Sequence, residues 1–102
     1  MREYKFKRGY KATAERLEEM LKKHFGEFRK DGEKYIVSFG AMEEMVAWIE
    51  NKKLYVETRT NKNVPDDVAL ETIKRYNKFL EELTGYTAKE RRKQMMKEVE
   101  EG

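Results

Sequence analysis

Near the N-terminus, alternating polar and apolar residues predict a short strand, and a different spacing of apolar residues predicts a helix after it. Tyr4 and Phe6 alternate with charged neighbours, the period-two pattern of a half-buried strand, and Gly9 ends it. Thr13 is a suitable N-cap for a helix that ends at Gly26. Its apolar positions recur at spacings of three and four and are Ala14, Leu17, Leu21 and Phe25.

The dipeptide Asp31-Gly32 is a strong turn signal and predicts a hairpin with these two residues as its loop. The strand that follows ends at Gly40, with apolar residues on one face and polar residues on the other. The predicted pairs are Lys30 with Glu33 and Phe28 with Tyr35.

Residues 41–50 fit either a helix or a strand, and the segment after them favours a strand over 43–50. Residues 54–60 read as a strand rich in β-branched and aromatic residues, and Asn51-Lys52 can form the tight turn between the two. The pairs expected in this hairpin are Trp48 with Tyr55, Ile49 with Leu54 and Glu50 with Lys53.

A long helix is predicted to open at Pro65 and to end at Gly85. Its apolar stripe comprises Ala69, Ile73, Tyr76, Leu80 and Leu83. Thr87 and Glu90 then form a capping box, which starts a separate C-terminal helix. The residues that this last helix can bury are Ala88, Met95, Met96 and Val99.

These elements predict an α+β fold in one domain. The order β-α-β-β-β-β-α places helices on one face of an antiparallel sheet of about five strands, with a C-terminal helix added. Residues 1–86 form the domain, and residues 87–102 are a basic helix belonging to it. The order resembles the helix-grip arrangement and the repeat unit of the TATA-binding-protein-like fold, an analogy of topology that implies no function.

Composition restricts the setting of the protein more than its role. The 102 residues carry a formal net charge of +3, with 42% charged residues, and Ser38 and Gln94 are the only residues of their types. Lys and Glu enrichment of this kind is typical of proteins from hot environments. The sequence has no apolar run long enough for a membrane span and no signal-peptide pattern, so we expect a soluble, cytoplasmic protein.

Few side chains offer catalytic or metal chemistry, and we expect neither an enzyme nor a bound cofactor or metal. The chain has no cysteine, Ser38 lies within a strand, and His24 is the only imidazole. We expect His24 to be a surface residue at the end of its helix. The glycines are scattered as turns and form no phosphate-binding loop.

The charge is distributed unevenly along the chain. Residues 1–11 and residues 87–97 each sum to +4, and the rest of the chain, residues 12–86 and 98–102, sums to −5. A basic first strand and a basic last helix could therefore meet in a patch that attracts anions.

The sheet face opposite the helices is the second candidate surface. The alternation of residues 45–57 turns Trp48 and Tyr55 outward among charged residues. Such a face suits a sheet-to-sheet dimer, cover by the last helix, or base stacking. The expected partner surface comprises Trp48, Tyr55, Arg59, Lys5, Lys7, Arg8, Lys11, Arg91, Arg92 and Lys93.

Two stretches carry a family resemblance. Residues 8–10 (Arg-Gly-Tyr) and residues 84–93, which begin Thr-Gly-Tyr, are similar to a small archaeal family of unknown function. The resemblance covers nearly the whole chain and implies a compact α+β fold. It implies no catalytic residues.

Three hypotheses about function follow. The first is a non-enzymatic interaction module that forms a homodimer through the open sheet face or the C-terminal helix. The second is a nucleic-acid-binding protein with basic ends and an aromatic platform. The third is a helix-grip domain that binds a small molecule, which requires a cavity of at least ~300 Å³ beneath the long helix.

Overall fold

The elements of the chain follow the predicted order. The computed structural model describes residues 2–93. The strands and helices are β1 (Arg2–Lys5), α1 (Ala14–Phe25), β2 (Arg29–Asp31), β3 (Lys34–Phe39), β4 (Met42–Glu50), β5 (Lys53–Thr60) and α2 (Asp66–Thr84). The strand predicted over residues 43–50 is confirmed as β4. Residues 88–93 begin the expected last helix. Its predicted apolar residues Met95, Met96 and Val99 lie outside the described residues.

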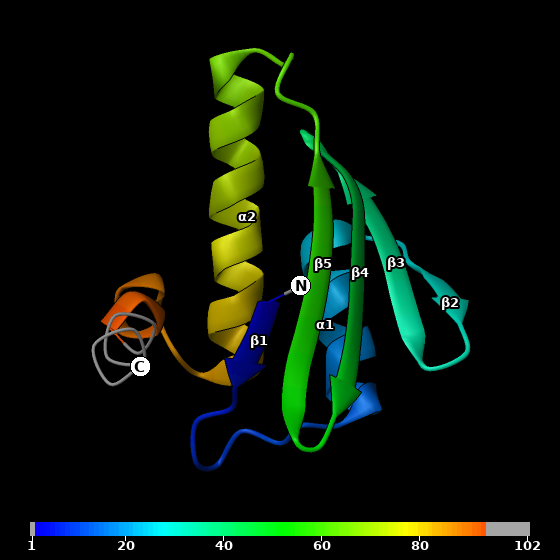
Figure 1. Ribbon diagram of the computed structural model, residues 1–102, viewed down its shortest axis with the longest axis vertical. Helices are drawn as coiled ribbons and strands as arrows, with labels where there is room; N and C mark the ends of the chain where they lie inside the picture. Colours follow the sequence, from blue (N-terminus) through cyan, green and yellow to red (C-terminus); the bar gives the residue numbers. More distant parts are fainter. Residues whose placement is uncertain (1, 94–102) are drawn as a thin grey trace.

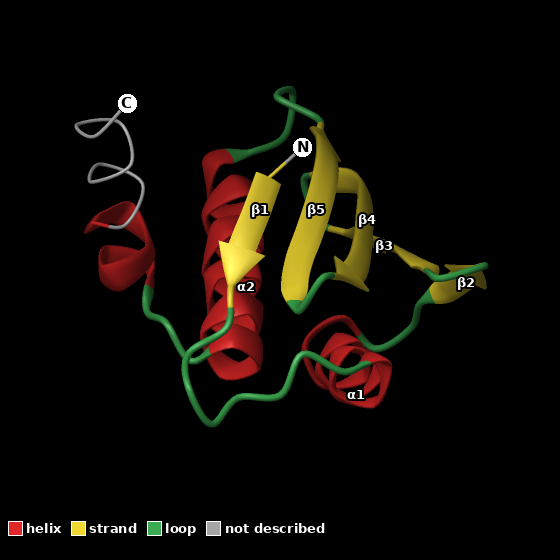
Figure 2. Cartoon of the chain, turned by 60° about the horizontal axis from the view of Figure 1, so that its bottom comes forward, coloured by secondary structure: helices red, strands yellow, loops and turns green. Residues whose placement is uncertain are grey.

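The five strands form one antiparallel sheet in the order β1-β5-β4-β3-β2. Helices α1 and α2 pack on the same face of this sheet, and no described helix covers the opposite face (Figures 1 and 2). We call that opposite side the outer face. No helix in the described part of the chain is long and apolar enough to cross a membrane.

The core lies between the inner face of the sheet and the two helices. Successive side chains of a strand point to opposite faces of the sheet. The apolar residues at alternate positions therefore all point to the inner face, where the helices bury them. The main core residues are Tyr4, Leu17, Leu21, Tyr35, Val37, Met45, Leu54, Val56, Phe79, Leu80 and Leu83. The α+β expectation, with helices on one face only, is confirmed.

The two hairpins test the turn predictions with different results. Asn51 and Lys52 both have positive φ, and Trp48 pairs with Tyr55 as predicted. The other hairpin pairs Asp31 with Lys34 instead of Lys30 with Glu33, so its loop is Gly32-Glu33 and the predicted register is wrong. Only Gly32 of this loop has positive φ, which fits a turn whose first central residue is glycine.

The buried stripe of α2 is rotated from the predicted one. Ile73 is 55% exposed, whereas Thr72 and Phe79 are buried. Phe79 packs against Phe25 of α1, with ring centroids 5.3 Å apart. This contact joins residues far apart in sequence, so the pattern within α2 could not reveal it. The helix also begins at Asp66, one residue later than expected.

His24 is buried, so the expectation of a surface residue is wrong. Its ring meets Phe79 edge-on, and its Nε2 lies 3.3 Å from a carboxylate oxygen of Glu82. The same Glu82 oxygen accepts a hydrogen bond from Lys23 at 2.7 Å. His24 therefore belongs to the contact between α1 and α2.

The loop between β1 and α1 secures the C-terminal end of α2. The backbone N–H of Lys7 donates to the carbonyl of Thr84 at 2.7 Å. The guanidinium of Arg16, in the first turn of α1, adds to this by donating to the carbonyls of Glu82 and Leu83. The last carbonyls of a helix have no partner within the helix, so these bonds satisfy groups that would otherwise need water.

The first half of α2 has a separate attachment to the turn between β3 and β4. The N–H of Ala41 donates to Thr72 Oγ1 at 2.9 Å, and that hydroxyl donates to the carbonyl of Val68. Gly40 precedes this contact with φ of 53°, and a Cβ on it would collide with Thr72 Oγ1. The close approach of turn and helix thus requires glycine at this position.

Replacing Gly40 tests this contact. We expect Gly40→Ala to lower the free energy of unfolding by about 2–3 kcal/mol, because it adds a collision in a packed site to the cost of positive φ. The matched control is Gly32→Ala, since Gly32 also has positive φ (63°) but has open space within 4 Å of the point where a Cβ would lie. The control should lose only ~1 kcal/mol. Denaturant unfolding measures both, and equal losses would contradict the close approach.

Candidate functional site

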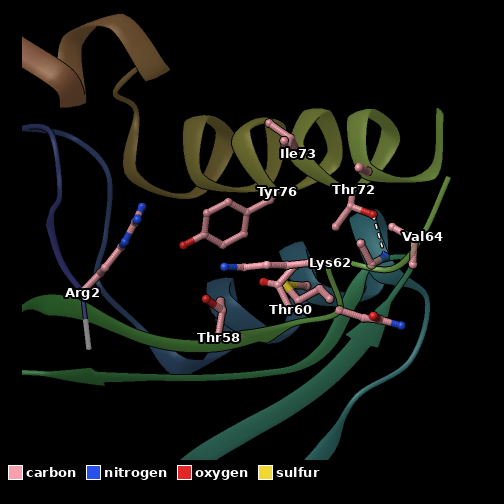
Figure 3. A pocket seen from close by; sticks show the side chains of 12 residues that line it. Arg2, Thr58, Thr60, Lys62, Val64, Thr72, Ile73 and Tyr76 are labelled. Atoms are coloured by element: carbon pink, nitrogen blue, oxygen red, sulfur yellow. Dashed lines mark hydrogen bonds between the residues drawn. The ribbon is translucent and has the colours of Figure 1, made fainter. Parts of the chain in front are cut away.

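A cavity of about 440 Å³ lies between the first half of α2 and the sheet (Figure 3). Its walls come from the starts of β1 and β4, the end of β5, the loop over residues 61–64 and one side of α2. The lining residues are Arg2, Ala41, Met42, Thr58, Thr60, Asn61, Lys62, Val64, Ala69, Thr72, Ile73 and Tyr76. The cavity is thus larger than the ~300 Å³ set as the requirement for a binding domain.

The cavity exists because α2 is packed tightly at one end only. Phe79, Leu80 and Leu83 in the second half of the helix are almost fully buried. Toward its N-terminus the helix leaves Ala69 partly exposed and Ile73 largely exposed. The second half therefore fixes the helix to the sheet, while the first half stands off from it.

The short first strand leaves the sheet side of the cavity open. The pairing of β1 with β5 spans Lys5 with Lys53 to Arg2 with Val56. Thr58 and Thr60 of β5 follow beyond this pairing and are exposed. They lie on the inner face, because Thr58 pairs with buried Met45 and side chains directly opposite share a face.

Two contacts between α2 and the sheet bound the cavity. One is the bond from Ala41 to Thr72 described above. At the other end the hydroxyls of Tyr4 and Tyr76 lie 3.0 Å apart. Burial, reinforced by the neighbouring Tyr4 hydroxyl, raises the pKa of Tyr76 far above its usual range. Tyr76 therefore keeps its proton at physiological pH and remains a neutral hydrogen-bonding group.

The charges that line the cavity are all positive. Arg2 and Lys62 are its ionisable residues besides Tyr76, and no Asp or Glu is among the twelve. Figure 3 shows the Lys62 side chain reaching toward the Tyr76 hydroxyl, with Arg2 at the same end. The apolar part of the wall comes from Ala41, Met42, Val64, Ala69 and Ile73. The cavity thus combines a basic end with apolar walls.

The third hypothesis placed a cavity beneath the long helix, but none of its polar lining residues was identified from the sequence, although one signal was available. The inner-face positions of β5 change from apolar Leu54 and Val56 to Thr58 and Thr60. Polar residues at core-facing positions indicate that the core ends there. The same alternation that places Trp48 outward could therefore have located the sheet side of the cavity.

The predicted aromatic pair lies on the outer face. The rings of Trp48 and Tyr55 are stacked, with centroids 5.7 Å apart and planes 14° apart. The ammonium of Lys34 lies 4.7 Å from the Trp48 ring centroid. Arg59, on the same strand as Tyr55, pairs with Glu43 at 3.3 Å.

Charges of both signs surround this pair. Register places Lys5 opposite Lys53 on the outer face, and Lys53 pairs with Glu3 at 2.6 Å. The acids that the register and the ion pairs place on this face are Glu3, Asp31, Glu43, Glu44, Glu50 and Glu57. The bases are Lys5, Arg29, Lys34, Lys53 and Arg59. The outer face is therefore mixed in charge, without a basic excess.

The basic ends lie near each other but form a different surface. The pKa of Glu90 is lowered, mainly by the hydrogen bond from the Thr87 backbone and in smaller part by the charges of Lys7 and Lys93. Arg8, Lys11 and Arg92 are exposed in the same two segments. This region lies on the α2 side of β1, where the C-terminal segment docks, and not beside β4 (Figures 1 and 2), the strand that contains Trp48.

Arg91 differs from the other basic residues at the ends, because it is only 8% exposed. Its guanidinium donates to the carbonyl of Tyr86 at 2.6 Å and to the side-chain oxygen of Asn77 at 3.1 Å. It also lies 6.0 Å from the centroid of the Tyr4 ring. Burial lowers the pKa of Arg91. These contacts hold the C-terminal segment against α2 and β1, so the described part of that segment does not cover the outer face.

No group of three or more His, Asp or Glu side chains within residues 2–93 is arranged to hold a metal ion. The capping box is present, since Thr87 and Glu90 exchange hydrogen bonds of 3.2 Å. The last helix therefore starts as predicted, with a structural role for both residues.

Comparison with known proteins gives a family and a fold relative. Residues 1–97 match the family described as a domain of unknown function, DUF5611. The solution structure of a hypothetical protein from Thermoplasma acidophilum is similar, with 28% identity and a TM-score of 0.65 over 93% of this chain and 97% of that chain. No curated protein matches the chain. The predicted resemblance is confirmed, and the chain belongs to the DUF5611 family of unknown function.

Proposed function

We propose that this protein binds a small organic molecule in the cavity between α2 and the sheet and catalyses no reaction on it. The supporting observation is the cavity itself, whose volume of about 440 Å³ lies within the usual range of ligand sites. A wall that joins apolar side chains to a few convergent polar groups is also typical of such sites.

The lining supports binding without catalysis. Its twelve described residues include no carboxylate, imidazole or thiol, which are the groups that most often act as general bases or nucleophiles in catalysis. Two contacts at the ends, Ala41 with Thr72 and Tyr4 with Tyr76, join α2 to the turn before β4 and to β1. Walls that are joined in this way lose little conformational freedom when a ligand binds.

The proposal is tested by titrating the protein with octanoate and with 1-octanol while following backbone amide resonances by NMR. Binding of either probe should shift the amides of Ala41, Thr60 and Thr72 most strongly. If neither probe binds, or if the shifts concentrate around Trp48, the proposed function is wrong.

Two cavity-filling variants sharpen this test. Ala69→Trp fills the cavity from α2 and Thr60→Trp fills it from β5, and each should reduce probe affinity at least about tenfold. The control is Leu70→Trp, because Leu70 is 57% exposed on the same helix and does not line the cavity. Thermal unfolding confirms that each variant is folded. Retention of full affinity in both cavity-filling variants would contradict the assignment.

Self-association through the outer face is a second candidate function. The stacked Trp48 and Tyr55 rings, together with half-buried Ile36 and Val46, form an apolar centre on this face. The surrounding charges include both signs in similar number, so the face is complementary to a second copy of itself in a two-fold dimer. The same acids would repel phosphates, which makes nucleic acid the less favoured partner for this face.

Sedimentation over a wide concentration range tests the dimer. We expect a monomer–dimer equilibrium, and Trp48→Glu should raise its dissociation constant at least about tenfold, because central aromatic residues dominate interface energies. Leu70→Glu is the control, since Leu70 is an exposed apolar residue that lies on α2, away from the outer face. A protein that remains monomeric at every concentration would rule out this candidate.

A further inference from the structure

The chemistry of the cavity wall identifies the class of molecule that it fits. We propose that the ligand is an organic anion with an apolar body, and that its anionic group is held by Arg2 and Lys62. This inference rests on the proposed binding function and specifies its ligand.

The first support is the sign of the charges. Arg2 and Lys62 line the cavity without any acidic residue, in a chain that has 20 Asp and Glu against 23 Lys and Arg. Neither side chain is within ion-pair distance of a carboxylate in residues 2–93. A bound anion would therefore meet two cations without displacing a carboxylate from either of them within this region.

The second support is the direction of the polar groups. Lys62 extends across the cavity toward the Tyr76 hydroxyl, and Arg2 approaches the same end from β1 (Figure 3). Both cations therefore lie at the end of the cavity that Tyr76 lines. A guanidinium and an ammonium at one end of a cavity suit a carboxylate, which accepts several charge-assisted hydrogen bonds.

The tyrosine pair adds a neutral donor at this end. The Tyr4 and Tyr76 hydroxyls carry two protons, and the single hydrogen bond between them, 3.0 Å long, uses one. When Tyr4 donates in that bond, the proton of Tyr76 remains available to a ligand oxygen. The raised pKa of Tyr76 keeps this proton in place and avoids a negative charge that would repel an anion.

The third support concerns the rest of the ligand. Met42, Val64 and Ala69 supply apolar wall away from the cations, and Ile73 is largely exposed beside the cavity. A hydrocarbon body would cover this surface and gain the free energy of removing it from water. The lining has no carboxylate to receive an ammonium group, so a simple carboxylate should be favoured over a zwitterionic amino acid of similar size.

Three probes of equal chain length separate the contribution of the anionic group to binding from that of the hydrocarbon body. Octanoate carries the proposed anionic group, 1-octanol removes the charge, and octylammonium reverses it. Calorimetry and amide chemical shifts should show octanoate binding at least about tenfold more tightly than 1-octanol, with octylammonium weakest.

Side-chain variants locate the contact. Lys62→Gln and Arg2→Gln should each weaken octanoate binding about three- to tenfold and leave 1-octanol binding unchanged, because only the anion uses the charge. Lys62→Arg should retain most of the octanoate affinity. Lys11→Gln is the matched control for net charge, since Lys11 is exposed and does not line the cavity.

The outcomes distinguish this inference from the proposed function. If octanoate and 1-octanol bind the cavity with equal affinity and the Arg2 and Lys62 variants change neither, the site takes a neutral ligand and the inference fails while the binding function stands. If Lys11→Gln weakens octanoate as much as Lys62→Gln does, the effect is general electrostatic attraction and the inference also fails. If neither probe binds in the cavity, the binding function itself is wrong.

Discussion

The packing of the second half of α2 is the interaction on which the rest of the structure depends. Phe79, Leu80 and Leu83 fill the space between α1 and the inner face of the sheet. Lys7 in the loop before α1 and Arg16 in the first turn of α1 fix the same end of the helix. Since the buried apolar residues of α2 are concentrated at this end, their packing sets the direction of the helix axis. The cavity lies between the sheet and the other end of the helix, which carries fewer buried apolar residues.

Local patterns in the sequence were sufficient for most of the fold. The Asn51-Lys52 turn fixed the pairing of Trp48 with Tyr55, and that pairing fixed which face of the sheet each residue of β4 and β5 occupies. The other hairpin was predicted in the wrong register because a glycine can occupy either loop position, and the strand before it is only three residues long. Short strands supply too few side chains to correct the register.

The cavity could not be predicted in the same way. It depends on how far one helix diverges from a sheet, and that distance is set by contacts such as Phe79 with Phe25, which join distant parts of the chain. Arg2 and Lys62 come from opposite ends of the sheet-forming segment and look like ordinary surface cations in the sequence. By contrast, the two segments that carry the family resemblance contact each other in the structure. The ring of Tyr10 from the first segment packs directly against Gly85 from the second.

The two halves of α2 carry two sets of residues, one that packs into the core and one that lines the cavity. The side chains that stabilise the fold, such as Phe79 and Leu83, are distinct from Thr58, Ala69 and Ile73, which line the cavity and contribute little to the core. Substitutions at these three positions remove no side chain of the core cluster. Proteins that share this fold can therefore diverge in what they bind while they conserve how they fold, and conservation among them should be uneven along this single helix.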